Sequence, residues 1–383
     1  MPNRFGSGGS ETYPGGVRHT PIRRSRMTAS SDPGPRPAPE IPRQAEAVIA
    51  AAVDAAVSRL RSLLETHLAA LPEGTVPPEQ AEALSGGKHL RAQALITVAH
   101  AYGDPDPGFL TAAAAAVELL HTASLVHDDI IDGSSMRRGA AALHVVSGDD
   151  TAILVGDLLL GIAQEIAAPF GHRASAPLAR ALRALSTGQL LEPALGWGDN
   201  APPLLERYAA LKTGALFGAA FELGGAAAGA TGGDEPDAAA LAAAGERLGL
   251  AFQVADDLLD VHGDAAELGK DHGADLRNGI PTLPLWLASR RLAGETRAGA
   301  TDPTCAPGAA PSTAPAEPTA LPADRLAAAA GAPEVTAAAR ARIAELFAEG
   351  RAMLPPARRP QLLDLAARIV VPGAPNVVPA IPQ

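Results

Sequence analysis

Apolar residues recur every three to four positions along most of the chain, which is the period of an amphipathic helix. The segment after Pro42, QAEAVIAAAVDAAVSRLRSLLETHLAAL, shows this period clearly. Long segments rich in Ala and Leu follow, separated by short turn-like stretches such as YGDPDPG and GWGDNAPP. No stretch alternates like a strand, and aromatic residues make up only 3% of the chain. The pattern predicts an all-α protein.

Three segments fall outside this helical pattern. Residues 1–42 are rich in Gly, Ser, Pro and Arg and have no apolar period, which is typical of a disordered tail. Residues 292–322 are low in complexity and rich in Pro, so we interpret them as a loop inserted between helices. The helical segment after this loop is too short to form a core of its own. We therefore predict one all-helical domain at 43–371, followed by a C-terminal tail at 372–383.

Composition and charge exclude several classes of protein. The chain has 42 acidic and 31 basic side chains, and its formal net charge of −11 disfavours a protein that binds nucleic acid. Its one cysteine, Cys305, excludes an intrachain disulfide and a cysteine-based zinc cluster. We find no signal peptide and no apolar run long enough to be a transmembrane segment. These features favour a soluble cytoplasmic protein.

The stretch HTASLVHDDIIDGSSMRRG places three aspartates at the end of an apolar segment. On a helix, Asp128 and Asp132 lie one turn apart on one face, and Asp129 flanks them. Ionised carboxylates this close repel one another unless a cation lies among them. Arg137 and Arg138 follow within a short loop and could supply that charge as ion pairs. A divalent cation is the alternative, because Mg²⁺ prefers oxygen ligands.

A second cluster decides between these readings. In LAFQVADDLLDVHGDAAELGKDHGADL, Asp256, Asp257 and Asp260 repeat the spacing of the first cluster, with Gln253 one turn earlier and Lys270 downstream. Two such clusters on packed helices are improbable as solvated surface. Facing each other across a cavity, they would hold several Mg²⁺ ions and a diphosphate whose oxygens complete the coordination.

The order of motifs resembles that of the trans-isoprenyl diphosphate synthase (polyprenyl synthetase) family. The two aspartate motifs are DDIIDGSSMRRG and FQVADDLLD, and the second is followed by GKDHGADL and RNGIPTLPL. GGKHLRAQ stands upstream and YAALKTGALF stands between them, so the likeness runs from Gly86 to Leu285. The chain departs from the family in having His89 where Arg is common and Ala92 where Pro is common.

The resemblance implies a single large helical bundle of the isoprenoid synthase type with a central substrate cavity. In that family isopentenyl diphosphate is condensed with an allylic diphosphate to give an all-trans polyprenyl diphosphate. Mg²⁺ meets the negative charge that develops on the departing diphosphate. The ligands carried over from the two motifs are Asp128, Asp129, Asp132, Asp256, Asp257 and Asp260.

The resemblance also implies which residues contact the two substrates. The cations carried over to the allylic diphosphate are Arg137, Lys212 and Lys270. The residues carried over to isopentenyl diphosphate are Lys88, Arg91, His121 and Arg138. Thr213 and Gln253 would be neutral partners near the reacting carbons or the diphosphate. The released diphosphate can accept the proton, so no protein base is required. A homodimer and peripheral membrane contact for product release are further expectations of this resemblance.

Two other functions share part of this pattern. A class I terpene cyclase also ionises an allylic diphosphate with Mg²⁺, but it needs no second diphosphate site and so has no use for Lys88, Arg91 and Arg138. A non-catalytic partner subunit has little need of two intact aspartate clusters. Both therefore rank below a prenyltransferase.

The helix before the first cluster predicts the length of the product. In the family the growing chain runs along this helix, and one helical turn rises about 5.4 Å, close to one isoprene unit. The positions one turn before Asp128 are Ala123 and Ser124, with Leu120 two turns and Val117 three turns before it. None of these is aromatic. We therefore predict a product longer than geranylgeranyl diphosphate, from hexaprenyl to decaprenyl, with a short-chain farnesyl or geranylgeranyl synthase as the alternative.

Overall fold

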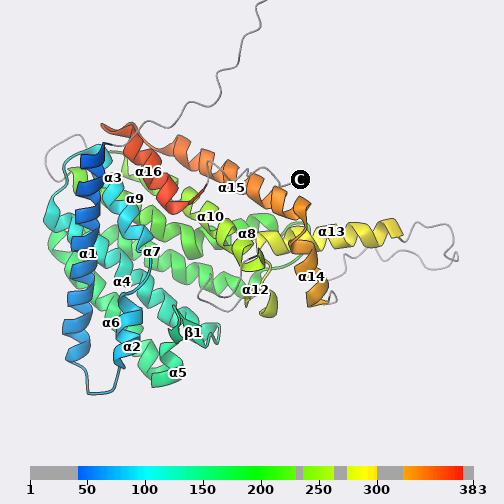
Figure 1. Ribbon diagram of the computed structural model, residues 1–383, viewed down its shortest axis with the longest axis horizontal. Coiled ribbons are helices and arrows are strands. Elements are labelled where there is room, and N and C mark those ends of the chain that lie inside the picture. The colour runs from blue at the N-terminus through cyan, green and yellow to red at the C-terminus, as the bar shows by residue number, and fades with distance from the viewer. Residues whose placement is uncertain (1–41, 230–235, 263–273, 300–321, 374–383) are drawn as a thin grey trace, which may run out of the picture. The chain divides into compact units, whose positions relative to one another are not determined.

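The computed structural model describes residues 42–229, 236–262, 274–299 and 322–373. These residues are almost entirely helical, and the only strands among them are two-residue segments that form one small hairpin. The predicted all-α class is thus confirmed. Figure 1 shows the helices packed side by side, with α15 and α16 at one edge and α2 and α5 at the opposite edge.

The described residues of the first half of the chain form seven α-helices, two short strands and one 3₁₀ turn. They are α1 (Arg43–Ala69), α2 (Pro78–Ser85), α3 (Leu90–Tyr102), α4 (Pro107–Ile131), β1 (Met136–Arg137), β2 (Ala140–Ala141), α5 (Leu143–Ser147), α6 (Asp149–Ala167), the 3₁₀ turn η1 (Ala168–Phe170) and α7 (His172–Leu191).

The second half begins with a 3₁₀ turn, and further helices follow it. They are η2 (Glu192–Ala194), α8 (Pro202–Ala209), the π-helical turn η3 (Ala210–Gly214), α9 (Ala215–Gly229), α10 (Ala238–His262), α12 (Ala274–Arg277), α13 (Leu283–Gly299), α14 (Ala323–Ala330), α15 (Pro333–Met353) and α16 (Pro360–Val370).

Helix α4 lies inside the bundle because its sequence is apolar on nearly every side. Its start is set by Asp106, whose carboxylate accepts a hydrogen bond from the Phe109 N–H at 2.6 Å, and by Pro107 in the first turn. Helices α1, α3, α6, α7 and α9 contact it. A helix that is hydrophobic all round belongs in a core, and this one carries the first aspartate cluster at its C-terminal end.

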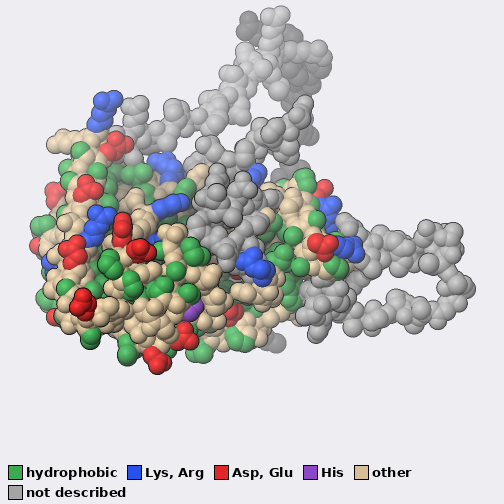
Figure 2. All heavy atoms as spheres, turned by 60° about the horizontal axis from the view of Figure 1, so that its bottom comes forward, with side chains coloured by type: hydrophobic (Ala, Val, Ile, Leu, Met, Phe, Trp, Pro, Cys, Tyr) green, Lys and Arg blue, Asp and Glu red, His purple; other side chains and the backbone are tan. Residues whose placement is uncertain are grey.

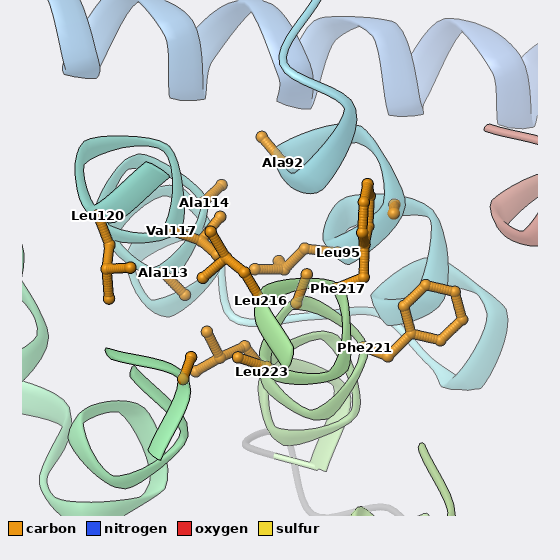
Figure 3. Close-up of a cluster of buried hydrophobic side chains, with 14 of the residues drawn as sticks. Ala92, Leu95, Ala113, Ala114, Val117, Leu120, Leu216, Phe217, Phe221 and Leu223 are labelled. Atoms are coloured by element: carbon orange, nitrogen blue, oxygen red, sulfur yellow. The ribbon is translucent and has the colours of Figure 1, made fainter. Parts of the chain in front are cut away.

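Side chains from α4 and α9 meet in the hydrophobic core. Figure 3 shows Val117 of α4 directed toward α9, where it meets Leu216, with Leu120 on another side of α4 and Leu223 further along α9. On the other side of α9, Phe217 and Phe221 lie against α3. All of these side chains are at most 1% exposed.

Helices α9 and α10 approach each other so closely that only glycine fits at the contact. A Cβ on Gly245 would lie 2.5 Å from the Phe217 carbonyl oxygen, and one on Gly214 would lie 2.7 Å from the Glu246 carbonyl oxygen. Both neighbours are backbone atoms, which cannot move aside alone. This contact fixes the segment before α9 against α10, where the second aspartate cluster lies.

The structure moves one predicted boundary. We expected a loop from residue 292, but α13 continues to Gly299. The reason is packing, since Leu292 is 5% exposed and belongs to a small apolar cluster with Leu326 and Ala330 of α14. The rest of the predicted loop, 300–321, lies outside the described residues, as do 1–41 and 374–383 of the two predicted tails. The domain from 43 to 371 as a whole stays a prediction.

Two helices are long and apolar enough to cross a membrane by length and composition alone, namely Pro107–Ile131 and Asp149–Phe170. The first is α4, and 78% of its apolar window is buried inside the bundle. The second includes α6, and only 39% of its window is buried. A buried core helix passes the same test, so α4 gives no support for a membrane span, and the exposed face of α6 needs another explanation.

The α9–α10 contact gives a prediction about stability. Gly245→Ala should lower the free energy of unfolding by about 1–3 kcal/mol, because the added methyl group overpacks a backbone contact. Gly161→Ala is the matched control, since a Cβ there meets nothing within 4 Å and the residue lies on the exposed side of α6. That variant should gain up to about 1 kcal/mol from helix propensity. Urea unfolding measures both, and equal effects would contradict the packing argument.

Candidate active site

One pocket of about 400 Å³ collects most of the predicted site residues. It lies where the C-terminal end of α4 meets η3, α10 and α12. The predicted residues that line it are Arg91, His121, Ser124, Asp128, Asp132, Arg137, Lys212, Thr213, Gln253 and Asp256. Predicted site residues up to 165 positions apart in the sequence, Arg91 and Asp256, thus share one cavity, and both aspartate clusters reach it.

The first cluster ends in a tight hairpin that separates the two arginines. Arg137 pairs with Ala140, so Arg138 and Gly139 form the two-residue turn, with φ values of 52° and 80°. Positive φ at both central positions is the signature of a type I′ turn, which glycine adopts freely and arginine does not. The turn sends Arg137 toward the pocket and Arg138 away from it, where its Nη1 donates to the Ala83 carbonyl at 2.8 Å.

Asp129 differs from its neighbours because it already has a cationic partner. It is 3% exposed and accepts hydrogen bonds from Nε of Arg137 at 2.9 Å and from the Nη2 of the same guanidinium. Asp128 and Asp132, by contrast, line the pocket. The structure therefore gives Asp129 an ion pair and places the other two carboxylates where a ligand can reach them.

The carboxylates of the first cluster are held in an environment that favours protonation. Burial, helped by the charges of Asp132 and Asp129, raises the pKa of Asp128 to about 6 against the opposing charges of Lys212 and Arg137. Burial likewise raises the pKa of Asp132. The raised pKa values mean that the ionised forms of these carboxylates are not balanced by nearby positive charge. A cation bound at this end of the pocket would stabilise the ionised forms.

Lys212 and Thr213 reach the pocket from a π-helical turn. The sequence ALKTG forms this turn between α8 and α9, and such single turns often mark functional sites because the extra residue changes the direction of the side chains. Thr213 Oγ1 donates to the Gln253 side-chain oxygen, and the Gln253 Nε2 donates to Asp257 Oδ1 at 2.7 Å. This chain of hydrogen bonds ties the turn to the second aspartate cluster.

Two residues that the sequence argument did not identify hold Lys212. Glu192 Oε2 accepts from the Lys212 Nζ at 3.0 Å and from the Tyr208 hydroxyl at 2.5 Å. Burial lowers the pKa of Lys212, but the carboxylates of Asp128, Glu192 and Asp132 outweigh this effect and raise it. Lys212 therefore stays protonated and lies between Glu192 and the first cluster. Glu192 gave no sequence signal, because it stands alone after α7.

The opposite end of the pocket is basic. Arg91 is partly buried with its guanidinium 4.7 Å from the centre of the Phe217 ring, and burial lowers its pKa to about 10, so it remains charged at neutral pH. Burial, followed by the charges of Arg91, Arg138 and Arg137, holds the pKa of His121 well below 6.5. His121 is neutral because it is buried and because three guanidinium groups lie near it, whose positive charge is not fully balanced. A bound anion would balance that charge.

The remaining predicted residues lie elsewhere. Lys88 is exposed on the segment before α3, and Asp257 lines a neighbouring pocket. Asp260 is 4% exposed, and its Oδ1 has no hydrogen-bond partner in the described part of the chain. Val117, Leu120 and Ala123 are fully buried in the core, whereas Ser124 lines the pocket. Lys270 lies outside the described residues.

Several lining residues were missed by the sequence argument. They include Leu185, Leu216, Phe252, Arg277 and Asn278, and Asp275, which we had interpreted as a residue that orders the loop, also lines the pocket. The last three belong to the DLRN stretch that follows the second cluster, and that position was the signal that could have found them. Leu185, Leu216 and Phe252 give no sequence signal, because an apolar residue on a buried helix is ordinarily part of the core.

The donors at the acidic end suit a hard divalent cation, although they do not form a closed metal site. Among the described residues no three carboxylate or imidazole side chains converge closely enough to hold a metal ion by themselves. Asp128, Asp132 and Asp256 line the same cavity, however, and offer only oxygen atoms. Mg²⁺ is commonly bound through one or two carboxylates plus phosphate oxygens, so the residues fit a metal ion that binds together with a diphosphate.

Comparisons with known proteins agree with this geometry. The family model described as polyprenyl synthetase matches residues 79–302. The chain belongs to the polyprenyl synthetase family. It is 37% identical to the nonaprenyl diphosphate synthase of Mycobacterium tuberculosis over 64% of this chain and 72% of that protein. It is 36% identical to the farnesyl diphosphate synthase of Escherichia coli over 64% of this chain and 86% of that protein.

A solved structure extends the likeness to the fold. The polyprenyl synthase from Caulobacter crescentus, complexed with calcium and isoprenyl diphosphate, superposes with a TM-score of 0.67 at 31% identity, covering 88% of this chain and 99% of that one. Matches to two other curated relatives cover 66% and 62% of their lengths. The predicted family and the predicted prenyltransferase class are confirmed, and enzymes of this class are generally metal-dependent.

The raised pKa of Asp128 predicts that this residue destabilises the metal-free protein. The pKa in the folded state, about 6, exceeds the usual value of 3.8, so stability falls as the pH rises through this window and the full cost is present above pH 6. Asp128→Asn should therefore raise the free energy of unfolding by about 1–3 kcal/mol at pH 8 in EDTA, and by much less near pH 4. Thermal denaturation at both pH values measures this. Asp54→Asn, on the exposed side of α1, is the control that should change nothing.

Proposed function

We propose that the protein is a Mg²⁺-dependent trans-polyprenyl diphosphate synthase that condenses isopentenyl diphosphate with an allylic diphosphate. The observation that carries this proposal is a single pocket with two chemically different ends. Carboxylates of two helices line this pocket, and so do Arg91 and His121, with His121 two helical turns before Asp128 on α4. Two diphosphates can thus be held at once, one through metal ions and one through cationic side chains.

The chain's own residues would bind and orient the allylic diphosphate at the acidic end. Asp128, Asp132 and Asp256 would hold Mg²⁺, which when bound acts as a Lewis acid toward the leaving diphosphate. Lys212 and Arg137 would donate charge-assisted hydrogen bonds to the same oxygens. The allylic C–O bond breaks and the electron pair leaves with the diphosphate, so these donors stabilise the charge that develops there.

The extender substrate would bind at the basic end. Arg91 and His121 face the pocket, and Lys88 and Arg138 lie on the segments next to it. A new C–C bond forms between the isopentenyl double bond and the allylic carbon, and the proton that is lost passes to the released diphosphate. This second cationic site favours a prenyltransferase over a terpene cyclase, which binds one diphosphate, and over a non-catalytic partner subunit, which needs neither site.

The function is tested by incubation with labelled isopentenyl diphosphate, an allylic primer and saturating Mg²⁺. Asp256→Ala should lower turnover by about 10²-fold or more, because it removes a metal ligand from the leaving-group site. Asp54→Ala, a solvated aspartate on α1, should leave turnover unchanged. Chain extension by the wild type supports the proposal. A cyclic hydrocarbon, or no product from the protein alone, would support one of the two rival functions instead.

We also propose a product longer than geranylgeranyl diphosphate. An apolar groove of about 340 Å³ adjoins the central pocket and shares Ser124, Asp128, Leu185 and Lys212 with it. The groove continues between α4, α6 and α7 along Leu160 and Leu182. No Phe, Tyr or Trp of the described part of the chain lines it, so a growing prenyl chain could leave the diphosphate site past Ser124. The similarity to both a nonaprenyl and a farnesyl synthase leaves a short-chain product as the alternative.

Filling this groove should shorten the product. Ser124→Phe places an aromatic ring one turn before Asp128, at the junction of the pocket and the groove. Mass spectrometry of the products should show a shift toward farnesyl or geranylgeranyl diphosphate with turnover of the first condensation retained. Ser62→Phe, on the exposed side of α1, is the control. A wild type that already stops at geranylgeranyl diphosphate would contradict the proposed length.

The same proposal includes a homodimer in the cytoplasm, with peripheral membrane contact for release of an apolar product. Large hydrophobic side chains are exposed on α5 and α6, including Val145, Ile153 and Leu154. Figure 2, which brings the edge with α2 and α5 forward, shows hydrophobic side chains between acidic ones. A second copy of the chain would cover such a surface, and sedimentation of the wild type would test this.

A further inference from the structure

A buried carboxylate with no assigned role lies behind the basic end of the pocket. Glu118, on α4, is 4% exposed and does not line the cavity. An ionised carboxylate in such a place is costly unless it is paired and hydrogen-bonded. Its surroundings supply both kinds of partner.

Glu118 holds the start of α3 from another helix. Its Oε1 accepts a hydrogen bond from the Ala92 N–H at 2.9 Å, and its Oε2 lies 3.4 Å from Nδ1 of His89. The first N–H groups of a helix need acceptors, and the N-cap residue here, His89, supplies no side-chain acceptor. His89 also has a φ of 48°, a left-handed conformation that the surrounding contacts must maintain. The carboxylate therefore fixes the turn into α3.

The same carboxylate is the counter-charge for two arginines. Its charge raises the pKa of Arg91 against burial, and it does the same for Arg138. Arg91 has no acceptor for its buried Nε among the residues that the structure describes. The Arg138 guanidinium lies against Gly87, where an added Cβ would be 3.0 Å from Nη2. The segment that carries Lys88 and Arg91 is thus bounded by Glu118 on one side and Arg138 on the other.

We infer that Glu118 is a positioning residue for the extender diphosphate. Its carboxylate fixes the turn from Gly86 to Ala92, and so holds Arg91 toward the pocket with Lys88 next to it. It acts through these residues and touches no substrate. The two departures from the family in this motif, His89 and Ala92, supply the two groups that Glu118 contacts. This inference rests on the proposed function, because it concerns the second diphosphate of that reaction.

Three substitutions separate positioning from simple loss of charge. Glu118→Gln keeps an acceptor for the Ala92 N–H without the charge. Glu118→Asp keeps the charge but withdraws the carboxylate by about 1.5 Å, the length of one C–C bond. Glu118→Ala removes both. Positioning predicts that the KM for isopentenyl diphosphate rises at least about tenfold in the Ala and Asp variants and less than about threefold in the Gln variant. The KM for the allylic primer should stay within about twofold in all three.

A matched control and a binding measurement complete the test. Glu222→Ala removes another carboxylate that joins two helices, by its pair with Arg180, but lies away from the pocket. It should lower the melting temperature and leave both KM values unchanged. Calorimetric titration with inorganic diphosphate in EDTA should show about tenfold weaker binding to the Glu118→Asp variant than to the wild type. This measurement does not depend on catalytic turnover.

The possible outcomes are distinct. A KM for isopentenyl diphosphate within twofold of the wild type in the Asp variant overturns the inference, and so does a Gln variant that is as impaired as the Asp variant. A wild type that binds inorganic diphosphate but extends no primer would instead overturn the proposed function. If Glu118→Ala fails to fold, the Asp and Gln variants still decide the question.

Discussion

Repulsion among buried carboxylates is the constraint on which the rest of this site depends. Asp128 and Asp132 lie one turn apart at the end of an apolar helix, where burial raises the pKa of both. Asp129 is neutralised by Arg137, and Lys212 is shared between Glu192 and the first cluster. Among the described residues of this end of the pocket, Arg137 and Lys212 therefore already have carboxylate partners. The two pocket-lining carboxylates remain free to bind a cation that arrives with an anionic substrate.

The fold keeps this repulsion from being relieved by movement. Helix α4 is held on nearly all sides, and the glycine contacts between α9 and α10 leave no room for either helix to shift. The π-helical turn before α9 directs Lys212 and Thr213 toward the pocket, and the Thr213–Gln253–Asp257 hydrogen bonds tie the turn to the second cluster. A polar site built on rigid helices holds its charges at fixed separations, which is what electrostatic stabilisation of a leaving group requires.

The sequence predicted the features that depend on residues close together in the chain. It did not predict the features that depend on tertiary contacts. Asp128 and Asp132 both line the pocket, as expected for residues one helical turn apart, and the all-α class is confirmed. The ion pair of Asp129 and the separation of the two arginines depend on a type I′ turn with Arg138 at positive φ, which the residues RRG do not reveal. Glu192, Glu118 and Leu216 matter through tertiary contacts, and a single carboxylate or leucine on a helix carries no periodic signal. The residues 263–273, with Lys270, lie outside the described part of the chain.

The two ends of the pocket solve opposite electrostatic problems by the same means. At the acidic end, a lysine held by Glu192 moderates a cluster of carboxylates. At the basic end, Glu118 moderates a cluster of guanidinium groups and contacts the start of α3. In each case one opposite charge stabilises the site without neutralising it, since His121 is still held neutral and the pKa of Asp128 is still raised. The negative charge left at the acidic end would be balanced by the metal ions that hold one diphosphate. The positive charge left at the basic end would be balanced by the second diphosphate, so the fold has a charge pattern complementary to both substrates.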